Sequence, residues 1–270
     1  MMSNDNDDSH SRMRHQQQFE QLLDEYYDED SAPEISEIIK QIKLVEEYSL
    51  DRNRILCLFS HPEYCMKYMS QNVEGVSGYT VDEIYNGGIT LVFKSTYWKQ
   101  LSLPIKMYQW GARFEKSLES LEHRTNSLIF YCGLKFRTKP GELKTFFVKQ
   151  RVLSYDENNN PILSYLEGEE ISNVFYGDFV WARILASGEG MQHVRAYFSE
   201  GKRKEYPDVL SVREIEILKL VAQHKKSAEI SDLLGVSVHT VEKHRKNMVA
   251  RIGVSNMTGL LYLCRLCQLI

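Results

Sequence analysis

One glycine near the end of the chain constrains the fold more than any other residue. Gly235 follows a short apolar segment with helical spacing, residues 228–234, and Ser237 stands two positions further on. Glycine adopts the left-handed conformation that ends helices at little cost, and serine is a preferred residue at helix N-termini. Two helices joined by so short a glycine turn form a helix-turn-helix, so the sequence predicts this motif around Gly235.

The helix expected after Gly235 has an apolar side and a polar side. A projection at about 100° per residue places its apolar residues within one narrow arc. These residues are Val238, Val241, Met248 and Ile252. The opposite side carries the polar residues His239, Thr240, Lys243, Lys246 and Asn247. Such side chains suit DNA phosphates and base edges, but most charged helical faces are only solvated, so periodicity alone leaves both interpretations open.

A helix start is also well specified upstream of this motif. Ser211 is the expected N-cap, and Glu214, three residues later, completes a capping box in which each side chain bonds the other residue's backbone. Ile215, Leu218 and Ala222 then recur at helical spacing on one face. Three successive helices are therefore expected in this part of the chain.

The spacing of many residues across these helices resembles that of the LuxR/FixJ-type DNA-binding domain. The matching residues are Leu210, Ser211, Glu214, Leu218, Glu229, Ile230, Ser231, Val236, Ser237, Thr240, Val241, Glu242, Lys243, His244, Asn247, Arg251, Ile252, Gly253 and Val254. The resemblance implies an all-α four-helix domain over residues 208–270 whose third helix enters the major groove. The fourth helix of such domains, here about residues 256–269, commonly supports dimerisation.

The resemblance also assigns roles to residues of the third helix. Glu242, Lys243 and Lys246 match positions that usually touch bases or nearby phosphates. Thr240 and Asn247 match positions near the DNA backbone. With the other polar residues of the helix, the candidates for DNA binding are His239, Thr240, Glu242, Lys243, His244, Lys246 and Asn247.

Three residues depart from the family pattern. His224 stands where a glycine is often seen after the first helix. Glu242 stands where many members have a basic residue, and it can either accept a hydrogen bond from cytosine or repel a phosphate. Met257 stands where a basic residue is common, which removes one phosphate contact. Arg245 projects toward the apolar arc, and we expect it either to reach solvent or to pair with Glu214 or Asp232. These departures leave the operator sequence open.

The front half of the chain alternates helical and strand patterns. Helices are expected over residues 35–48 and 103–121, because apolar residues recur there at helical spacing. The expected strands are residues 54–59, 64–70, 130–136, 143–155 and 162–171. Turn-rich segments at 138–142 and 156–161 separate the last three strands, so we expect an α+β domain with an antiparallel sheet.

Three segments of this half resemble a PAS domain. Residues 75–84, with the sequence GVSGYTVDEI, precede the turns KPGE at 139–142 and DENNNP at 156–161. The resemblance implies a PAS-like domain over residues 35–190 that binds a small-molecule ligand or cofactor, or only dimerises. The alternative is an autoinducer-type ligand-binding front domain, which would be a three-layer sandwich instead of a five-stranded antiparallel sheet with helices on one side.

No cofactor is indicated by the residues of the front half, and neither haem nor flavin is expected. Cys132 lacks the flanking residues of the flavin-linking motif of light sensors, and the lone His123 near a helix end is a poor haem ligand. Cys264 and Cys267 lack a second Cys or His pair at zinc spacing, so we expect no metal site. Several aromatic residues suit an apolar ligand pocket, although an ordinary aromatic core is the simpler interpretation. They are Phe93, Trp98, Tyr108, Trp110, Phe130 and Phe136.

Charge divides the chain in the same way as these patterns. The whole chain has a net charge of −4, but residues 208–270 have nine basic and six acidic side chains, which leaves −7 for the rest. Residues 1–34 contain ten acids and two arginines, and we expect them to form an acidic flexible tail. Charged residues closed by Pro207 indicate a linker over residues 191–207. An acidic front would avoid DNA, whereas a basic C-terminal domain would attract it.

These features predict a cytoplasmic, homodimeric transcriptional regulator that reads two half-sites in double-stranded DNA. The polar, acidic N-terminal region and the lack of a long apolar run argue against a signal peptide and against membrane association. No P-loop, GxSxG or HExxH motif is present, so we expect no enzymatic activity. The remaining alternative is a protein-interaction module whose helix-turn-helix serves for packing and does not bind DNA.

Overall fold

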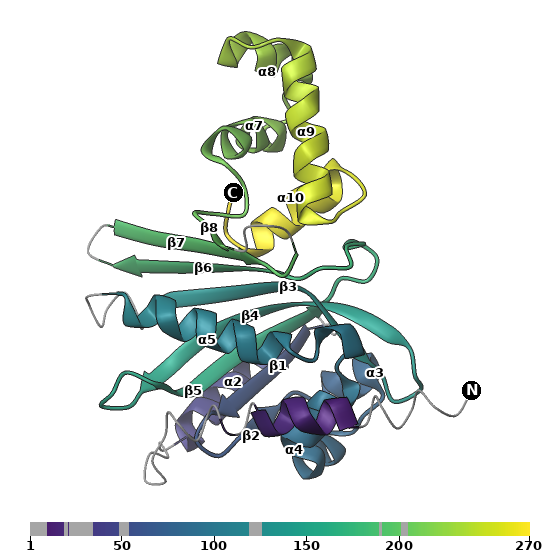
Figure 1. The fold of residues 1–270 in the computed structure, drawn as a ribbon, viewed down its shortest axis with the longest axis vertical. Coiled ribbons are helices and arrows are strands. Elements are labelled where there is room, and N and C mark those ends of the chain that lie inside the picture. The colour runs from purple at the N-terminus through teal and green to yellow at the C-terminus, as the bar shows by residue number, and fades with distance from the viewer. Residues whose placement is uncertain are drawn as a thin grey trace.

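The structure combines one large antiparallel sheet with a C-terminal group of helices (Figure 1). This computed structural model describes residues 10–18, 21, 35–48, 54–118, 126–188, 191–200 and 205–270. In these residues the sheet has eight strands in the order β2-β1-β5-β4-β3-β6-β7-β8, and neighbouring strands are antiparallel throughout. The expected fold class, an α+β antiparallel sheet domain followed by an all-α domain, is confirmed.

Most helices and strands lie close to the segments expected from the sequence. The strands are β1 Arg54–Ser60, β2 Cys65–Met69, β3 Ser127–Arg137, β4 Leu143–Tyr155, β5 Pro161–Glu170, β6 Trp181–Gly188, β7 Met191–Phe198 and β8 Glu205–Tyr206. The helices of the front half are α2 Ser36–Tyr48, α3 Asn72–Ser77, α4 Val81–Ser95, the short 3-10 helix η1 Trp98–Gln100 and α5 Leu103–Lys116. The C-terminal helices are α7 Val212–Ala222, α8 Ser227–Leu234, α9 Val238–Ile252 and α10 Met257–Leu266. None of the helices in the described ranges is long and apolar enough to cross a membrane.

The two faces of the sheet are covered by different helices, because alternate residues of a strand point to opposite faces. On β1, Cys57 packs with residues of α3 and α4, whereas Leu56 packs with Ile42 of α2. On β3, Ile129 packs with residues of α5, whereas Phe130 belongs to a core shared with the C-terminal helices. The same strands therefore contact α3, α4 and α5 on one face of the sheet, and α2 and the C-terminal helices on the other face.

The first five strands, β1 to β5, form the antiparallel sheet expected for a PAS-like domain, but helices cover both of its faces, because α2 packs on the face opposite α3 and α4. The five strands are contiguous in the sheet, and α3, α4 and α5 lie between β2 and β3 in sequence and cover one face. Strands β6, β7 and β8 extend the sheet beyond β3, which the sequence did not predict. Most of β6 is buried on both faces, so its sequence WARILASG lacks the alternation that marks a half-buried strand.

Two segments expected to be irregular contain regular structure. The sequence predicts a linker over residues 191–207, but this stretch supplies β7, paired with β6, and β8, paired with β7. Residues 10–18 of the expected flexible tail are helical, and the Arg12 guanidinium donates to the carbonyls of Phe93 and Thr96 at 2.8 and 2.7 Å. A basic side chain at the end of α4 satisfies carbonyls that have no partner within the helix. Most of the remaining tail lies outside the described residues.

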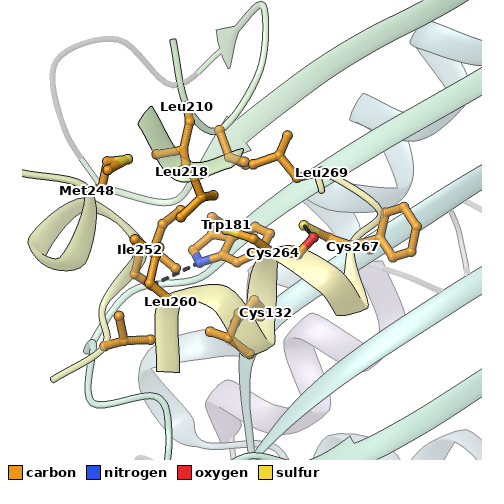
Figure 2. Packing of buried hydrophobic residues seen from close by; sticks show 14 of the residues in the cluster. Cys132, Trp181, Leu210, Leu218, Met248, Ile252, Leu260, Cys264, Cys267 and Leu269 are labelled. Carbon is orange, nitrogen blue, oxygen red and sulfur yellow. Dashed lines mark hydrogen bonds between the residues drawn. The ribbon is translucent and has the colours of Figure 1, made fainter. Parts of the chain in front are cut away.

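Hydrogen bonds join the sheet directly to the C-terminal helices (Figure 2). The Trp181 indole donates to the carbonyl of Ile252 at the end of α9 at 3.1 Å. The buried Arg183 guanidinium donates to the Asp208 carboxylate at 2.9 Å and to the Cys267 carbonyl at 2.8 Å. Around these bonds, one hydrophobic core extends from β3 and β6 to α7, α9 and α10. The sheet therefore holds the C-terminal end of α9 in place.

Candidate nucleic-acid interface and ligand cavity

Local capping bonds fix the boundaries of the helices that carry the candidate DNA-binding surface. Ser211 and Glu214 form the expected capping box at the start of α7. Gly235 ends α8 in the left-handed conformation with a φ of 63°, and Ser237 begins α9 by accepting from the Thr240 backbone N–H at 3.0 Å. α8 and α9 are therefore joined by the short turn of a helix-turn-helix.

The apolar side of α9 packs into the core, with one exception. Val241, Met248 and Ile252 are fully buried among the other C-terminal helices and the sheet. Val238, which falls within the same arc, is 45% exposed in the first turn of α9. The three buried side chains orient the opposite side of the helix toward solvent.

The polar side of α9 is its exposed side, as the sequence predicts. Its exposed residues are His239, Glu242, Lys243, Lys246 and Asn247, and its half-buried residues are Thr240 and His244. α8 and the N-terminal half of α9 form the end of the molecule farthest from the sheet (Figure 1). The front domain therefore leaves this end of the helix uncovered.

Glu242 makes a contact within the C-terminal domain. Its carboxylate accepts a hydrogen bond from the Ser227 hydroxyl at the start of α8, and Arg245 donates to the same hydroxyl at 2.7 Å. The Arg245 guanidinium also lies 3.8 Å from the Glu242 carboxylate. Glu214, one of the partners expected for Arg245, pairs instead with Arg251 at 2.7 Å. Glu242 and Arg245 therefore connect α9 to α8, and Arg251 connects α9 to α7.

The cysteines of α10 and its C-terminal end lie at the junction with the sheet. Cys264 and Cys267 are buried beside Cys132 of β3 (Figure 2). Burial raises the pKa of the Cys267 thiol to about 12, so this thiol is protonated at neutral pH. Across the described ranges, no group of three or more His, Cys, Asp or Glu side chains is arranged to hold a metal ion. The three thiols act as small core side chains.

A second candidate site lies on the opposite face of the sheet. A cavity of about 400 Å³ lies between the sheet and the helices α3, α4 and α5. Of the six aromatic residues considered as pocket lining, three line this cavity, namely Phe93, Tyr108 and Phe136. The other three do not: Trp98 is 54% exposed, Trp110 packs against Tyr197, and Phe130 belongs to the core on the other face. The front domain thus has both a cavity and an aromatic core.

Four polar side chains, three on neighbouring strands and one in the turn after β1, are linked by hydrogen bonds beside this cavity. Tyr131 of β3 donates to the Gln150 amide oxygen on β4 at 3.1 Å, and the Gln150 amide nitrogen donates to the Ser164 hydroxyl on β5 at 3.0 Å. The Ser164 hydroxyl lies 2.7 Å from Nε2 of His61, which follows β1. Burial lowers the pKa of His61 to about 3, so its imidazole is neutral at physiological pH. We call Tyr131, Gln150, Ser164 and His61 the polar row.

Sequence reasoning missed the polar row. Each member is a single polar residue in a different part of the chain, and only the pairing of β1, β3, β4 and β5 brings them together. Of the residues considered as cofactor ligands, Cys132 faces the C-terminal helices, and His123 lies outside the described residues.

Comparison with known proteins finds sequence similarity to bacterial regulators, and the match to a family model lies in the C-terminal helices. Residues 208–263 match the model of the family described as bacterial regulatory proteins, luxR family. The transcriptional regulatory protein MctR of Rhizobium johnstonii is 34% identical over 111 residues, which cover 38% of this chain and 50% of MctR. The transcriptional activator protein EsaR of Pantoea stewartii subsp. stewartii is 46% identical over 48 residues, which cover 18% of this chain and 19% of EsaR. The chain thus spans half or less of these curated relatives.

Among solved structures, the VqmA dimer of Vibrio cholerae is similar over most of its length. The match has a TM-score of 0.32 and 15% sequence identity, and it covers 84% of this chain and 86% of that chain. The description of this VqmA structure places VqmA among LuxR-type receptors.

Proposed function

We propose that this chain, whose residues 208–263 form a C-terminal domain of the luxR family of bacterial regulatory proteins, is a transcriptional regulator that binds double-stranded DNA through α9. The orientation of α9 supports this function. Its buried apolar side leaves Lys243 and Lys246 exposed on the opposite side. A helix-turn-helix reads DNA by placing its second helix in the major groove, which requires an uncovered polar side.

The proposed DNA contacts come from the polar side of α9. They are His239, Thr240, Glu242, Lys243, His244, Lys246 and Asn247. Lys243 and Lys246 would neutralise phosphates, and the exposed amide and imidazole groups would reach phosphates or base edges. The bond from Ser227 draws the Glu242 carboxylate toward α8, which lessens its repulsion of a nearby phosphate.

The front domain is proposed to bind a small molecule that modulates DNA binding. Its cavity of about 400 Å³ has a volume typical of ligand sites. β3 lines this cavity with Tyr131 and contacts the C-terminal helices through Phe130. A ligand and the DNA-binding domain would therefore contact opposite faces of one strand.

We also propose a homodimer that reads two half-sites about one helical turn apart. On α10, Leu260 and Leu263 are buried in the core, whereas Tyr262 and Arg265 are exposed. If α10 supports dimerisation, a second subunit would contact the side that carries Tyr262 and Arg265.

Fluorescence anisotropy with an operator selected from random duplex DNA tests the proposed function. Lys243→Ala should weaken binding about tenfold and reduce the slope of log K against log salt concentration by about one, because one phosphate contact is lost. Lys106→Ala removes an exposed positive charge from α5 in the front domain, so it is the matched control and should bind like the wild type.

Two outcomes of this titration would contradict the proposal. If Lys243→Ala retained both the affinity and the salt slope of the wild type, the assignment of α9 as the reading helix would be wrong. If the wild type bound no duplex even at low salt, the chain would be an interaction module whose helix-turn-helix only packs.

A further inference from the structure

The cavity of the front domain has an almost uncharged lining. Apolar side chains of the sheet and of the covering helices form most of it, among them Ile55, Phe59 and Leu166. No aspartate or glutamate occurs among the described lining residues. Arg137 also borders the cavity, but it is exposed at the end of β3 and donates to the Gly141 carbonyl at 2.7 Å. Its charge is therefore hydrated and lies outside the apolar part of the lining.

Several polar side chains of the lining are already bonded to the backbone. The hydroxyls of Ser77, Ser95 and Thr96 donate to carbonyls of their own helices. The Gln100 amide donates to the Gly133 carbonyl at 2.9 Å, and its oxygen accepts from a backbone N–H of β3 at 2.8 Å. These groups stabilise the walls of the cavity and have little capacity left for a ligand.

Gln150 and Tyr131 of the polar row both line the cavity and retain hydrogen-bonding capacity. Gln150 donates one N–H to Ser164 and accepts one bond from Tyr131, whereas an amide has a second N–H and a second lone pair. The Tyr131 hydroxyl donates to Gln150, and its oxygen can still accept. His61 is neutral, and the ring of Tyr108 lies 5.8 Å from the imidazole. Burial and the nearby Glu115 carboxylate raise the pKa of Tyr131, but Glu115 lies outside the lining and accepts from the Tyr155 hydroxyl at 3.2 Å. The lining residues around the polar row can therefore bond a polar group but carry no charge that would balance an ion.

We infer that the cavity binds an uncharged small molecule with an apolar body and one hydrogen-bonding group that meets Gln150 and Tyr131. An amide, carbonyl or hydroxyl group can exchange hydrogen bonds with the polar row while the body displaces water from the apolar walls. An ionised carboxylate or ammonium would lose its hydration beside groups that carry no opposite charge, which is far more costly. The inference rests on the proposed ligand-binding function of the front domain.

Isothermal titration calorimetry of the full chain with three probes of equal length tests the inference. The probes are octanamide, octanoate and octylammonium at pH 7. Octanamide should bind at least about tenfold more tightly than either ion, because only the ions must be desolvated without a counter-charge. Octanoate or octylammonium binding as tightly as octanamide would overturn the inference. If octanoate bound the wild type as tightly as octanamide and Arg137→Gln abolished this binding, Arg137 would be the residue that recognises the head group.

Variants of β4 locate the head group. Gln150→Leu should lower the affinity for octanamide about tenfold, because the hydrogen bonds of the amide are lost while the apolar walls remain. Lys149→Gln is the matched control, since Lys149 is the preceding residue on β4, is not part of the lining, and pairs with Glu167 at 3.3 Å. This control should bind octanamide like the wild type.

Each remaining outcome decides the inference. Unchanged octanamide affinity in Gln150→Leu would show that the polar row does not recognise the ligand. Failure of all three probes to bind the wild type would show that the cavity does not bind a ligand of this class. If Gln150→Leu does not fold, the comparison of the three probes on the wild type still decides. The operator titration is a separate measurement, so a negative result here leaves the DNA-binding proposal standing.

Discussion

At the residue scale, the ring of Phe175 occupies a socket formed by three glycines. A Cβ atom added to Gly133 would lie 2.8 Å from this ring and 2.6 Å from the Phe179 carbonyl oxygen. A Cβ atom added to Gly177 or Gly253 would lie 2.8 or 2.7 Å from the same ring. Gly133 belongs to β3 and Gly253 ends α9, so Phe175 joins the sheet to the candidate DNA-binding helix through contacts that only glycine permits.

Gly133→Ala should destabilise the protein by about 2–4 kcal/mol, because a side chain is strained at a φ of 93° and the new methyl group overlaps Phe175. Urea unfolding followed by circular dichroism measures the loss. Gly75→Ala is the control, since a Cβ atom there meets nothing within 4 Å and alanine is a better helix former than glycine in α3. Equal stability of the two variants would show that the socket is not tightly packed.

At the scale of secondary structure elements, the start of α7 depends on a cap that is local in sequence. Ser211→Ala should lower the free energy of unfolding by about 1 kcal/mol, because the Glu214 backbone N–H loses its acceptor. Thr258→Ala, an exposed substitution within α10, should change it by less than about 0.5 kcal/mol. The midpoints of urea unfolding compare the two, and an unchanged midpoint for Ser211→Ala would mean that solvent replaces the cap.

The same contrast between local and distant contacts explains which elements the sequence predicts. The capping box at Ser211 was predictable, because it joins residues three positions apart. β6 was not, because Ile184 packs toward α5 and Leu185 toward the C-terminal helices, which leaves no polar alternation to read. A strand buried on both faces has the composition of any buried segment, and only its neighbours in the sheet define it.

The residues of the two candidate sites also differ in whether their contacts are local or distant in the sequence. The exposed side of α9 follows from helical periodicity, so the sequence was sufficient to group its polar residues. The bond between Glu242 and Ser227 depends on how α8 crosses α9, and the bond between His61 and Ser164 joins residues 103 positions apart. Contacts of this kind are set by tertiary packing, which a pattern along one strand or helix does not report.

At the scale of the whole molecule, the sheet and the C-terminal helices share one hydrophobic core. Leu128 and Phe130 of β3 lie in the same cluster as Ile217 of α7 and Leu260 of α10. The ion pair between Arg183 and Asp208 adds a buried charge contact between β6 and the segment that leads into α7. Domains joined only by a linker can unfold separately, whereas regions with a common core are expected to unfold in one transition.

Asp208→Asn tests this coupling, because it leaves the buried Arg183 guanidinium without its counter-charge. We expect a loss of about 2–4 kcal/mol, compared with little change for Asp178→Asn, whose carboxylate is exposed in its pair with Lys135. Tryptophan fluorescence follows the sheet domain through Trp98 and Trp110 and the junction with α9 through Trp181, whereas hydrogen exchange of α9 follows the C-terminal helices. In Asp208→Asn both signals should shift to lower urea together. If α9 lost protection while the fluorescence midpoint stayed at its wild-type value, the shared core would not couple the two regions. The sheet could then not transmit a change at the cavity to the helix through that core.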